Sequence, residues 1–353
     1  MNGNRALEQA TVLDAVVFRV DGQAFTRTDV LRWAERHDAE FARRVRRRLG
    51  LAAQADDDDP AESAIEKCAE NFRYDRGLED AGAMQQWLEQ RAISVETWWE
   101  ALRRSVLEST AVHSTDEALP ETGLDALNAE DWRADLCATD LLDSAVRDLA
   151  SRAAVATERG RAGRVSSTAG DASAAPEVSV PWDELGIGDE RLAECDARLD
   201  ALAAAWESWR SAIVTDAALK SVVDHHRLEW LVVDVVLSWW PGADAAREAI
   251  WCVKEDGQAL EAVSRDAHQP AEPSVLLLED APPPLHDVLL AAAPGDVVGP
   301  VEVGTQWVVA LVKNKRPPSL TEAPVRAAAE RAVERNAATP LLDRHVAWPD
   351  SPP

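Results

Sequence analysis

Histidine and cysteine are the side chains of this chain that could act as bases, nucleophiles or metal ligands, and their spacing decides which chemistry is available. His225 and His226 form the single adjacent histidine pair. His286 and His345 lie beside acidic residues in helix-like stretches, where surface hydrogen bonding accounts for them. The four cysteines are far apart and form no C-x-x-C pair: Cys68, Cys137, Cys195 and Cys252. These spacings predict no metal site, no bound cofactor and no catalytic grouping.

Nucleotide and nucleic-acid chemistry is also unsupported. Gly186 and Gly188 have no preceding strand and no third glycine, so this segment is a turn rather than a phosphate-binding loop. The net charge of −26, from 63 acidic and 37 basic residues, repels phosphate backbones and anionic lipid headgroups. We therefore expect no nucleic-acid or membrane partner. Two interpretations stay open: the charge attracts basic peptides or proteins, or it serves solubility alone.

The cysteines and the N-terminus together indicate the compartment. Each cysteine lies in an apolar helical stretch, which is typical of small buried hydrophobic residues in a reducing compartment. The N-terminus lacks a basic region followed by an uninterrupted apolar run, and no stretch approaches the roughly 20 apolar residues of a membrane span. The sequence therefore predicts a cytoplasmic protein.

The elements that position these residues are mostly helical in the first half of the chain. Alternating residues on both sides of Asp21 and Gly22 predict a β-hairpin over 15–26. A helix follows, with Thr28 as its N-cap. Its predicted buried stripe is Val30, Leu31, Ala34 and Val45. Apolar residues at three- and four-residue spacing predict further helices over 61–77, 83–90, 95–112 and 129–159.

Residues 160–180 consist largely of Gly, Ser, Ala and Thr. Such a segment buries too little apolar surface to offset the entropy of ordering it, so we expect a flexible linker that is most mobile over 160–175. Helices resume over 189–224.

The apolar pattern then changes its period. Residues 229–237 predict a buried strand, with Leu231, Val233, Val235 and Leu237 on one face. Helices are predicted over 243–255, 259–267 and 286–293, followed by a hairpin of strands 297–303 and 306–312 around Gly304 and Thr305. The last helix is predicted to begin at a capping box, residues 319–322, and to end near His345.

Tryptophan is unusually frequent, with 14 Trp against 4 Phe and 1 Tyr. Most of these indoles recur at helical spacing, as core residues do. The adjacent pairs Trp98-Trp99 and Trp239-Trp240 cannot both face one core, so one indole of each pair is predicted to lie at an interface.

The order of elements after residue 228 resembles that of parvulin-type peptidyl-prolyl isomerases: a strand, two helices, a Pro-Gly turn and a closing hairpin. Residues 289–320, LLAAAPGDVVGPVEVGTQWVVALVKNKRPPSL, are similar to the parvulin ending, in which a P-G-[DE]-V-[SV]-G-P segment and a last strand precede a basic Arg-Pro exit. The resemblance implies an α+β chain with a small parvulin-like domain, in which helices pack on an antiparallel sheet.

The catalytic pattern of that family does not carry over. Parvulins usually place one histidine in the first strand and another in the last, where this chain has Trp230 or Leu231 and Val308 beside Trp307. Residues 270–280 replace the family's Gly-Gly-Asp-Leu-Gly stretch. Because an isomerase must stabilise a twisted amide in a shaped pocket, these changes imply the loss of most activity. If any activity survives, the candidate residues are His225, His226 and Cys252.

The N-terminal part also resembles parvulin-related proteins. Residues 18–35, FRVDGQAFTRTDVLRWAE, resemble the opening of the helical domain of parvulin-type chaperones. The chain as a whole is most similar to the actinobacterial peptide maturation system proteins related to parvulins, which are encoded beside ribosomally made peptide precursors. The predicted organisation is a helical chaperone-like domain with its hairpin (1–159), the linker (160–180), connecting helices (181–226), the parvulin-like domain (227–318) and a C-terminal helix packing on the helical domain (319–353).

The resemblance implies a non-catalytic accessory protein that binds a precursor peptide or organises peptide-modifying enzymes. The candidate contact residues are Trp230, Trp239, Trp240, Trp307 and Val308. Two alternatives stay open: an active prolyl isomerase with an unorthodox pocket, and an obligate subunit of a peptide-modifying complex such as a lanthipeptide-type synthetase.

Overall fold

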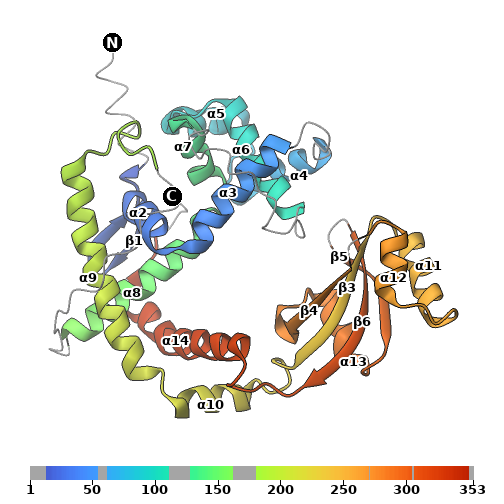
Figure 1. The fold of residues 1–353 in the computed structure, drawn as a ribbon. Coiled ribbons are helices and arrows are strands. Elements are labelled where there is room, and N and C mark those ends of the chain that lie inside the picture. Colours follow the sequence, from blue (N-terminus) through green and yellow to red (C-terminus); the bar gives the residue numbers. More distant parts are fainter. Residues whose placement is uncertain are drawn as a thin grey trace. The chain divides into compact units, whose positions relative to one another are not determined.

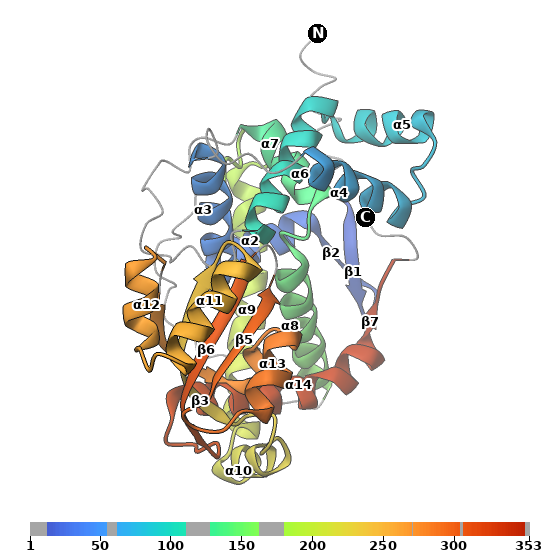
Figure 2. The same ribbon diagram turned by 90° about the vertical axis from the view of Figure 1, so that its right-hand side faces the viewer.

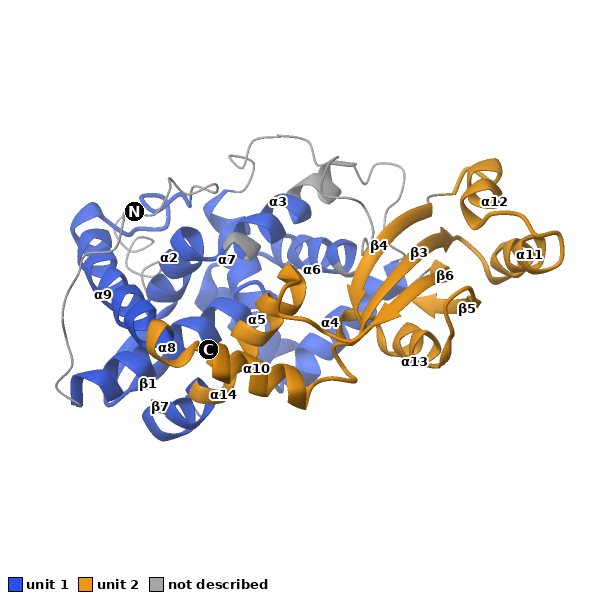
Figure 3. Ribbon diagram, turned by 60° about the horizontal axis from the view of Figure 1, so that its bottom comes forward, with its two compact units in different colours: residues 1–210, 338–353 blue, residues 211–337 orange. Residues whose placement is uncertain are grey.

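A computed structural model describes residues 13–54, 62–110, 128–161, 180–269, 271–303 and 306–349. The chain is α+β, as predicted, and forms two compact units (Figure 1, Figure 3). Unit 1 comprises residues 1–210 and 338–353, and unit 2 comprises residues 211–337. Nearly all of the predicted linker, and the predicted turn at Gly304 and Thr305, lie outside the described residues.

Unit 1 combines helices with one small sheet of order β2-β1-β7. Its elements are β1 (Val16–Val20), β2 (Gln23–Thr26), α2 (Arg27–His37), α3 (Ala39–Gln54), α4 (Glu62–Asp75), α5 (Ala81–Arg91), α6 (Val95–Thr110), α7 (Ala129–Ala138), α8 (Asp143–Arg161), most of α9 (Asp189–Ile213) and β7 (Val346–Ala347). The predicted hairpin is confirmed. Asp21 and Gly22 both have positive φ (47° and 87°), as the predicted Asp-Gly turn requires.

The N-cap of α2 is Thr26, not the predicted Thr28. The Thr26 amide donates to the Asp29 carboxylate at 2.7 Å, and the Thr26 hydroxyl accepts from the Asp29 amide, which completes a reciprocal cap. The Thr28 hydroxyl instead donates to the Leu13 carbonyl at 3.1 Å. The single helix predicted here is two helices, α2 and α3, because the backbone of Asp38 is extended (φ −111°, ψ 94°). The predicted buried positions are confirmed, since Val30, Leu31, Ala34 and Val45 are at most 2% exposed.

Residues 129–159 form two helices rather than the single one predicted. α7 ends at Thr139, whose backbone is extended (φ −127°, ψ 171°). The Thr139 hydroxyl donates to the Asp135 carbonyl at 2.7 Å and accepts from the Arg48 guanidinium at 2.8 Å. A β-branched residue with local hydrogen-bonding options thus ends the helix, although the apolar period continues across the break.

His345 lies at the C-terminal end of α14 (Ala323–His345), within the part of that helix that belongs to unit 1. It is 5% exposed, so the expected surface position was wrong. Its Nε2 lies 2.9 Å from a Glu158 carboxylate oxygen and its Nδ1 lies 3.4 Å from Asp21. Directly after it, β7 pairs with β1, which closes the small sheet.

Unit 2 is built on a four-stranded antiparallel sheet of order β4-β3-β6-β5 (Figure 3). Figure 2 shows its strands β3, β5 and β6 together with helices α11 and α13 of the same unit. Its elements are α10 (Asp216–His225), β3 (Val232–Trp240), α11 (Ala243–Lys254), α12 (Leu260–Asp266), β4 (Ala271–Leu277), a 3-10 turn (Leu278–Asp280), α13 (Pro283–Ala291), β5 (Val297–Val303), β6 (Gln306–Arg316) and the first part of α14.

Two predictions in unit 2 need correction, and one strand was not predicted. β3 runs from Val232 to Trp240, three residues later at each end than predicted. β4 was not predicted, because Pro273 and its polar neighbours do not read as a strand; it is tolerated at the edge of a sheet. No capping box forms before α14, since the Glu322 carboxylate pairs with Arg316 at 2.8 Å instead.

The sheet of unit 2 separates two apolar clusters. α13 covers one face, where the predicted strand face is confirmed: Val233, Val235 and Leu237 are buried there. α11 and α12 cover the other face through Ala246, Ala249 and Leu260. A third cluster joins α10, the start of β3 and the first half of α14. Unit 2 therefore has cores of its own.

Candidate functional site

The sheet face beneath α13 contains two of the five candidate contact residues, Trp239 and Val308. Along β3, the side chains directed to this face are Leu231, Val233, Val235, Leu237 and Trp239, and along β6 they are Val308, Ala310 and Val312. All of these are apolar. Leu285 and Leu289 of α13 are at most 2% exposed and close the face from above. Apart from the indole N–H of Trp239, these side chains carry no hydrogen-bonding group, so the centre of this face is a packed apolar core.

Trp230 and Val308 stand at the histidine positions of the resemblance, and both are buried. Val308 is 0% exposed and lies opposite Trp239 in the ladder between β3 and β6. Trp230 is 1% exposed and belongs to a different cluster, with Val223 and Val325. The structure therefore does not bring these two side chains together.

The remaining indoles divide between the two faces of the sheet. Trp240, opposite Trp307 in the ladder, is 3% exposed and packs with α11 and α12. Trp307 is half-buried on the same face, and Trp239 is half-buried on the other. The partner-binding role predicted for the five residues stays a prediction. Among the five, Trp239 and Trp307 expose the most surface.

The histidine pair ends α10, away from the central face. The ring of His226 stacks on Trp230 with centroids 4.7 Å apart, and His225 meets His226 edge-on. His226 Nδ1 lies 2.5 Å from the Glu229 carboxylate, and this hydrogen bond lowers the pKa of Glu229. Cys252 is half-buried on α11 and packs with the cluster on the opposite face of the sheet. Within the described ranges, no hydrogen bond or ring contact joins Cys252 to either histidine.

Sequence reasoning missed a hollow at one end of the sheet. Its volume is about 390 Å³, and its lining residues come from the segment before β3, the 3-10 turn and the start of α13: Glu229, Glu279, Ala281, Pro283, His286 and Asp287. His286 Nδ1 lies 3.0 Å from the Asp287 carboxylate, which confirms the expected local hydrogen bond of His286. Because β4 was not predicted, nothing in the sequence indicated that Glu229 and Glu279 would meet.

A buried polar pair was also missed. Ser238 on β3 and Ser264 on α12 are both 0% exposed, and their hydroxyl oxygens lie 2.7 Å apart. One hydroxyl donates to the other, so this hydrogen bond links α12 to the sheet and gives each buried oxygen a partner. This arrangement is a packing device rather than a nucleophile, since no base or carboxylate contacts it in the part of the chain that is described.

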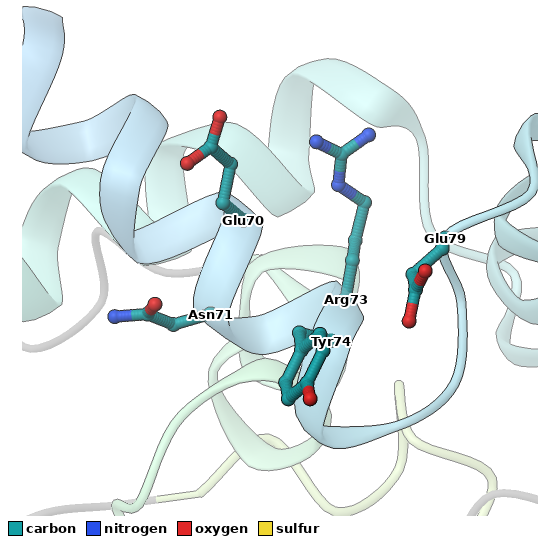
Figure 4. A pocket seen from close by; sticks show the side chains of 5 residues that line it. All are labelled: Glu70, Asn71, Arg73, Tyr74 and Glu79. Atoms are coloured by element: carbon teal, nitrogen blue, oxygen red, sulfur yellow. The ribbon is translucent and has the colours of Figure 1, made fainter.

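A second hollow lies on unit 1, where α4 turns toward α5 (Figure 4). It measures about 350 Å³ and is lined by Glu70, Asn71, Arg73, Tyr74 and Glu79. Tyr74 is 73% exposed, so this is a shallow polar surface rather than an enclosed binding site. Its charges are mixed, which gives it no preference for a ligand of one sign.

Metal and membrane chemistry find no support in the described ranges. Among residues 13–54, 62–110, 128–161, 180–269, 271–303 and 306–349, no three His, Cys, Asp or Glu side chains gather as metal ligands do. In that same portion of the chain, no helix has both the length and the apolar character needed to span a bilayer.

The sequence matches no protein-family model and no curated protein. Among solved structures, the chain is similar to the crystal structure of the foldase protein PrsA from Streptococcus pneumoniae, with 11% identity over 93% of this chain and 88% of that chain. The TM-score of this match is 0.27, so the fold class given above rests on the chain's own helices and sheets.

Proposed function

We propose that this protein is a non-catalytic accessory protein of a peptide maturation system, which binds a precursor peptide or holds it near the modifying enzymes. The observation that carries the proposal is the apolar sheet face beneath α13. Where the resemblance to parvulins calls for histidines, this chain has Trp230 or Leu231 and Val308, and of these Leu231 and Val308 lie on this face.

The physical argument concerns the transition state of proline isomerisation. A twisted amide is stabilised by a shaped pocket with polar groups placed around it. Here Val233, Val235 and Val308 fill the equivalent face with hydrocarbon, and Leu289 covers it. The side chains of these three valines and Leu289 therefore offer a substrate proline no hydrogen-bond donor. His225, His226 and Cys252 do not replace the lost groups, since they lie outside this cluster.

The same proposal covers partners and compartment. All four cysteines are free, which supports a reducing compartment such as the cytoplasm. The charge of −26 supports partners that carry positive charge rather than nucleic acid or anionic membranes.

A protease-coupled isomerisation assay on proline tetrapeptides tests the non-catalytic part. We expect a rate equal to buffer, and an active parvulin in the same assay serves as the positive control. Val308→His should not restore activity, because one polar group leaves the rest of the pocket filled. Wild-type acceleration above buffer would overturn the proposal.

Reconstitution with the modifying enzymes tests the accessory part. If the protein is an adaptor, leaving it out should raise the KM for the precursor peptide and spare turnover at saturating peptide. Loss of turnover at saturating peptide would instead identify an obligate catalytic subunit.

A further inference from the structure

β4 is an edge strand of the unit 2 sheet, and its outer side is open in the described part of the chain. It pairs with β3 along one side only. Helices α11 and α13 pack against β5, the strand at the opposite edge. Among the described residues, no backbone hydrogen bond engages the outer side of β4. Unpaired amides and carbonyls along an edge are a template for another strand.

The register shows which groups point outward. In an antiparallel pair, residues alternate between those that bond to the neighbouring strand and those that point away. The Leu278 amide donates to the Leu231 carbonyl at 2.9 Å, which places the even-numbered residues of β4 on the β3 side. The outward positions are therefore Ala271, Pro273, Val275 and Leu277. Proline at such a position leaves the ladder with β3 intact, because its missing N–H would have pointed outward.

Val275 is the centre of the open edge. Its side chain is 56% exposed, so an approaching chain meets no bulky cover at this residue. Its amide and carbonyl point outward. Leu277, two residues later, is 2% exposed because it packs with α10 and α14, so its backbone groups are covered. The accessible part of the edge is therefore centred on Val275, and Pro273 lacks an amide proton on the side that precedes it.

The charge of the surface beyond the end of β4 indicates which kind of peptide can bind along this edge. The hollow described above lies past the last ladder pair, Val232 and Leu277, and carries the carboxylates of Glu229, Glu279 and Asp287. In the described structure, Glu279 has no ion-pair or hydrogen-bond partner for its side chain. Ala281 and Pro283 supply an apolar wall for an aliphatic stem. The basic groups nearby are His226 and His286, each already paired with a carboxylate, and the exposed Arg227.

We infer that the outer edge of β4 and this acidic hollow form a docking surface for an extended, basic peptide segment. The segment pairs with the open edge at Val275 and places a lysine or arginine side chain against Glu279. Backbone pairing supplies affinity and the hollow supplies the preference for a basic side chain. This inference rests on the proposed peptide-binding function and specifies its surface and ligand chemistry.

Three hexapeptide probes test the recognition chemistry by calorimetry on the full chain. The first alternates lysine and valine, the second alternates glutamate and valine, and the third is the lysine peptide with alternate amides N-methylated. We expect the lysine peptide to bind and the other two to bind at least about tenfold more weakly, because each lacks one of the two recognition elements. Equal binding of all three would overturn the inference.

Two variants locate the surface. Val275→Pro removes an outward amide and spares the ladder with β3, so binding of the lysine peptide should weaken about threefold to tenfold. Glu279→Gln should weaken it about threefold and reduce its dependence on salt. Glu302→Gln is the matched control, since Glu302 is exposed on β5 of the same sheet, and it should bind as wild type does.

Amide hydrogen exchange gives a readout that does not depend on variants folding. The lysine peptide should protect the Val275 amide in wild-type protein. Protection confined to other segments, with unchanged binding by Val275→Pro, would overturn the docking surface while the proposed function stands. Isomerase activity would instead remove the proposed function. Self-association that Val275→Pro abolishes, without any peptide binding, would assign the edge to a second copy of the chain and overturn the basic-peptide assignment.

Discussion

Glu35 shows how single polar residues organise unit 1. Its carboxylate is buried and accepts three hydrogen bonds: from the Val180 amide at 2.9 Å, the Trp182 indole at 3.0 Å and the Arg32 guanidinium at 2.6 Å. Val180 opens the described segment that leads to α9, so Glu35 ties this segment to α2. A buried carboxylate is tolerated here because both of its oxygens are satisfied.

Replacing Glu35 by Gln should therefore destabilise the protein by about 1–3 kcal/mol, because an amide N–H₂ group cannot accept from the same donors. Urea unfolding measures the loss. Asp200→Asn is the matched control: its carboxylate accepts from Arg36 but is 57% exposed, so its removal should cost less than about 1 kcal/mol. Equal losses of unfolding free energy in the two variants would show that the burial of Glu35 adds nothing to its contribution to stability.

Cys195 lies against the buried end of α2, where its thiol donates to the Asp29 carboxylate at 3.3 Å. Burial, aided by the nearby charge of Asp196, raises the pKa of the Cys195 thiol to about 11. The folded protein thus favours the neutral thiol, so its contribution to stability is fully present below pH about 9 and is lost as pH rises toward about 11.

We expect Cys195, as the single cysteine of a variant in which the other three are alanine, to react with a disulfide reagent at pH 8 roughly 100-fold more slowly when folded than in urea. The factor follows from the smaller thiolate fraction. A Cys252-only variant, whose thiol is half-buried, controls for the reagent and should show a smaller difference. Similar ratios for both thiols would contradict the raised pKa of Cys195.

At the scale of elements, an irregularity inside β5 depends on a glycine. Gly299 has φ +115°, a backbone conformation that other residues rarely adopt. A Cβ atom at this position would lie 2.5 Å from the Val308 carbonyl oxygen on β6. The close approach of β5 and β6 at this irregularity in their ladder therefore requires the absence of a side chain.

Gly299→Ala should lower the free energy of unfolding of unit 2 by about 2 kcal/mol or more, through both the strained φ and the clash with backbone. Gly242→Ala is the control in the same unit, because Gly242 has negative φ and a Cβ atom added there would meet nothing within 4 Å. The control should cost less than about 1 kcal/mol. Denaturant unfolding of unit 2 alone measures the loss of stability in both variants. An unchanged free energy of unfolding for Gly299→Ala would mean that β5 and β6 can move apart to accept a Cβ atom.

At the scale of the whole molecule, the two units differ in how the chain builds them. Unit 2 is one continuous segment with its own apolar clusters. Unit 1 needs both ends of the chain, because β7 pairs with β1 and His345 contacts Glu158. Helix α14 contributes its first part to unit 2 and its last part to unit 1.

Residues 211–337 expressed alone should therefore fold cooperatively, since no cluster of unit 2 draws on outside residues. Near-UV circular dichroism of its tryptophans and a single unfolding transition would establish this. Truncation of the full chain after Ala337 should spare this transition and lower the midpoint of unit 1, which loses β7 and His345. A fragment without fixed tertiary signals would show that unit 2 depends on unit 1.

Much of the element order could be predicted from the sequence, because periodicity and turn chemistry are local. The hairpin at Asp21 and Gly22 and the buried face of β3 follow from residues close together in the chain. The apolar character of the sheet face at Val308 followed from the sequence as well. These properties need no knowledge of distant partners.

Only the tertiary structure determined the rest, because burial depends on what packs from elsewhere in the chain. The sequence of β4 does not predict a strand, and the strand forms because it pairs with β3. This pairing brings Glu279 beside Glu229. The sequence predicts a surface position for His345, whereas in the structure it is buried in contact with Asp21, directly after β1, and Glu158 of α8. The acidic hollow and the open strand edge are products of long-range pairing, which a local pattern of residue types does not encode.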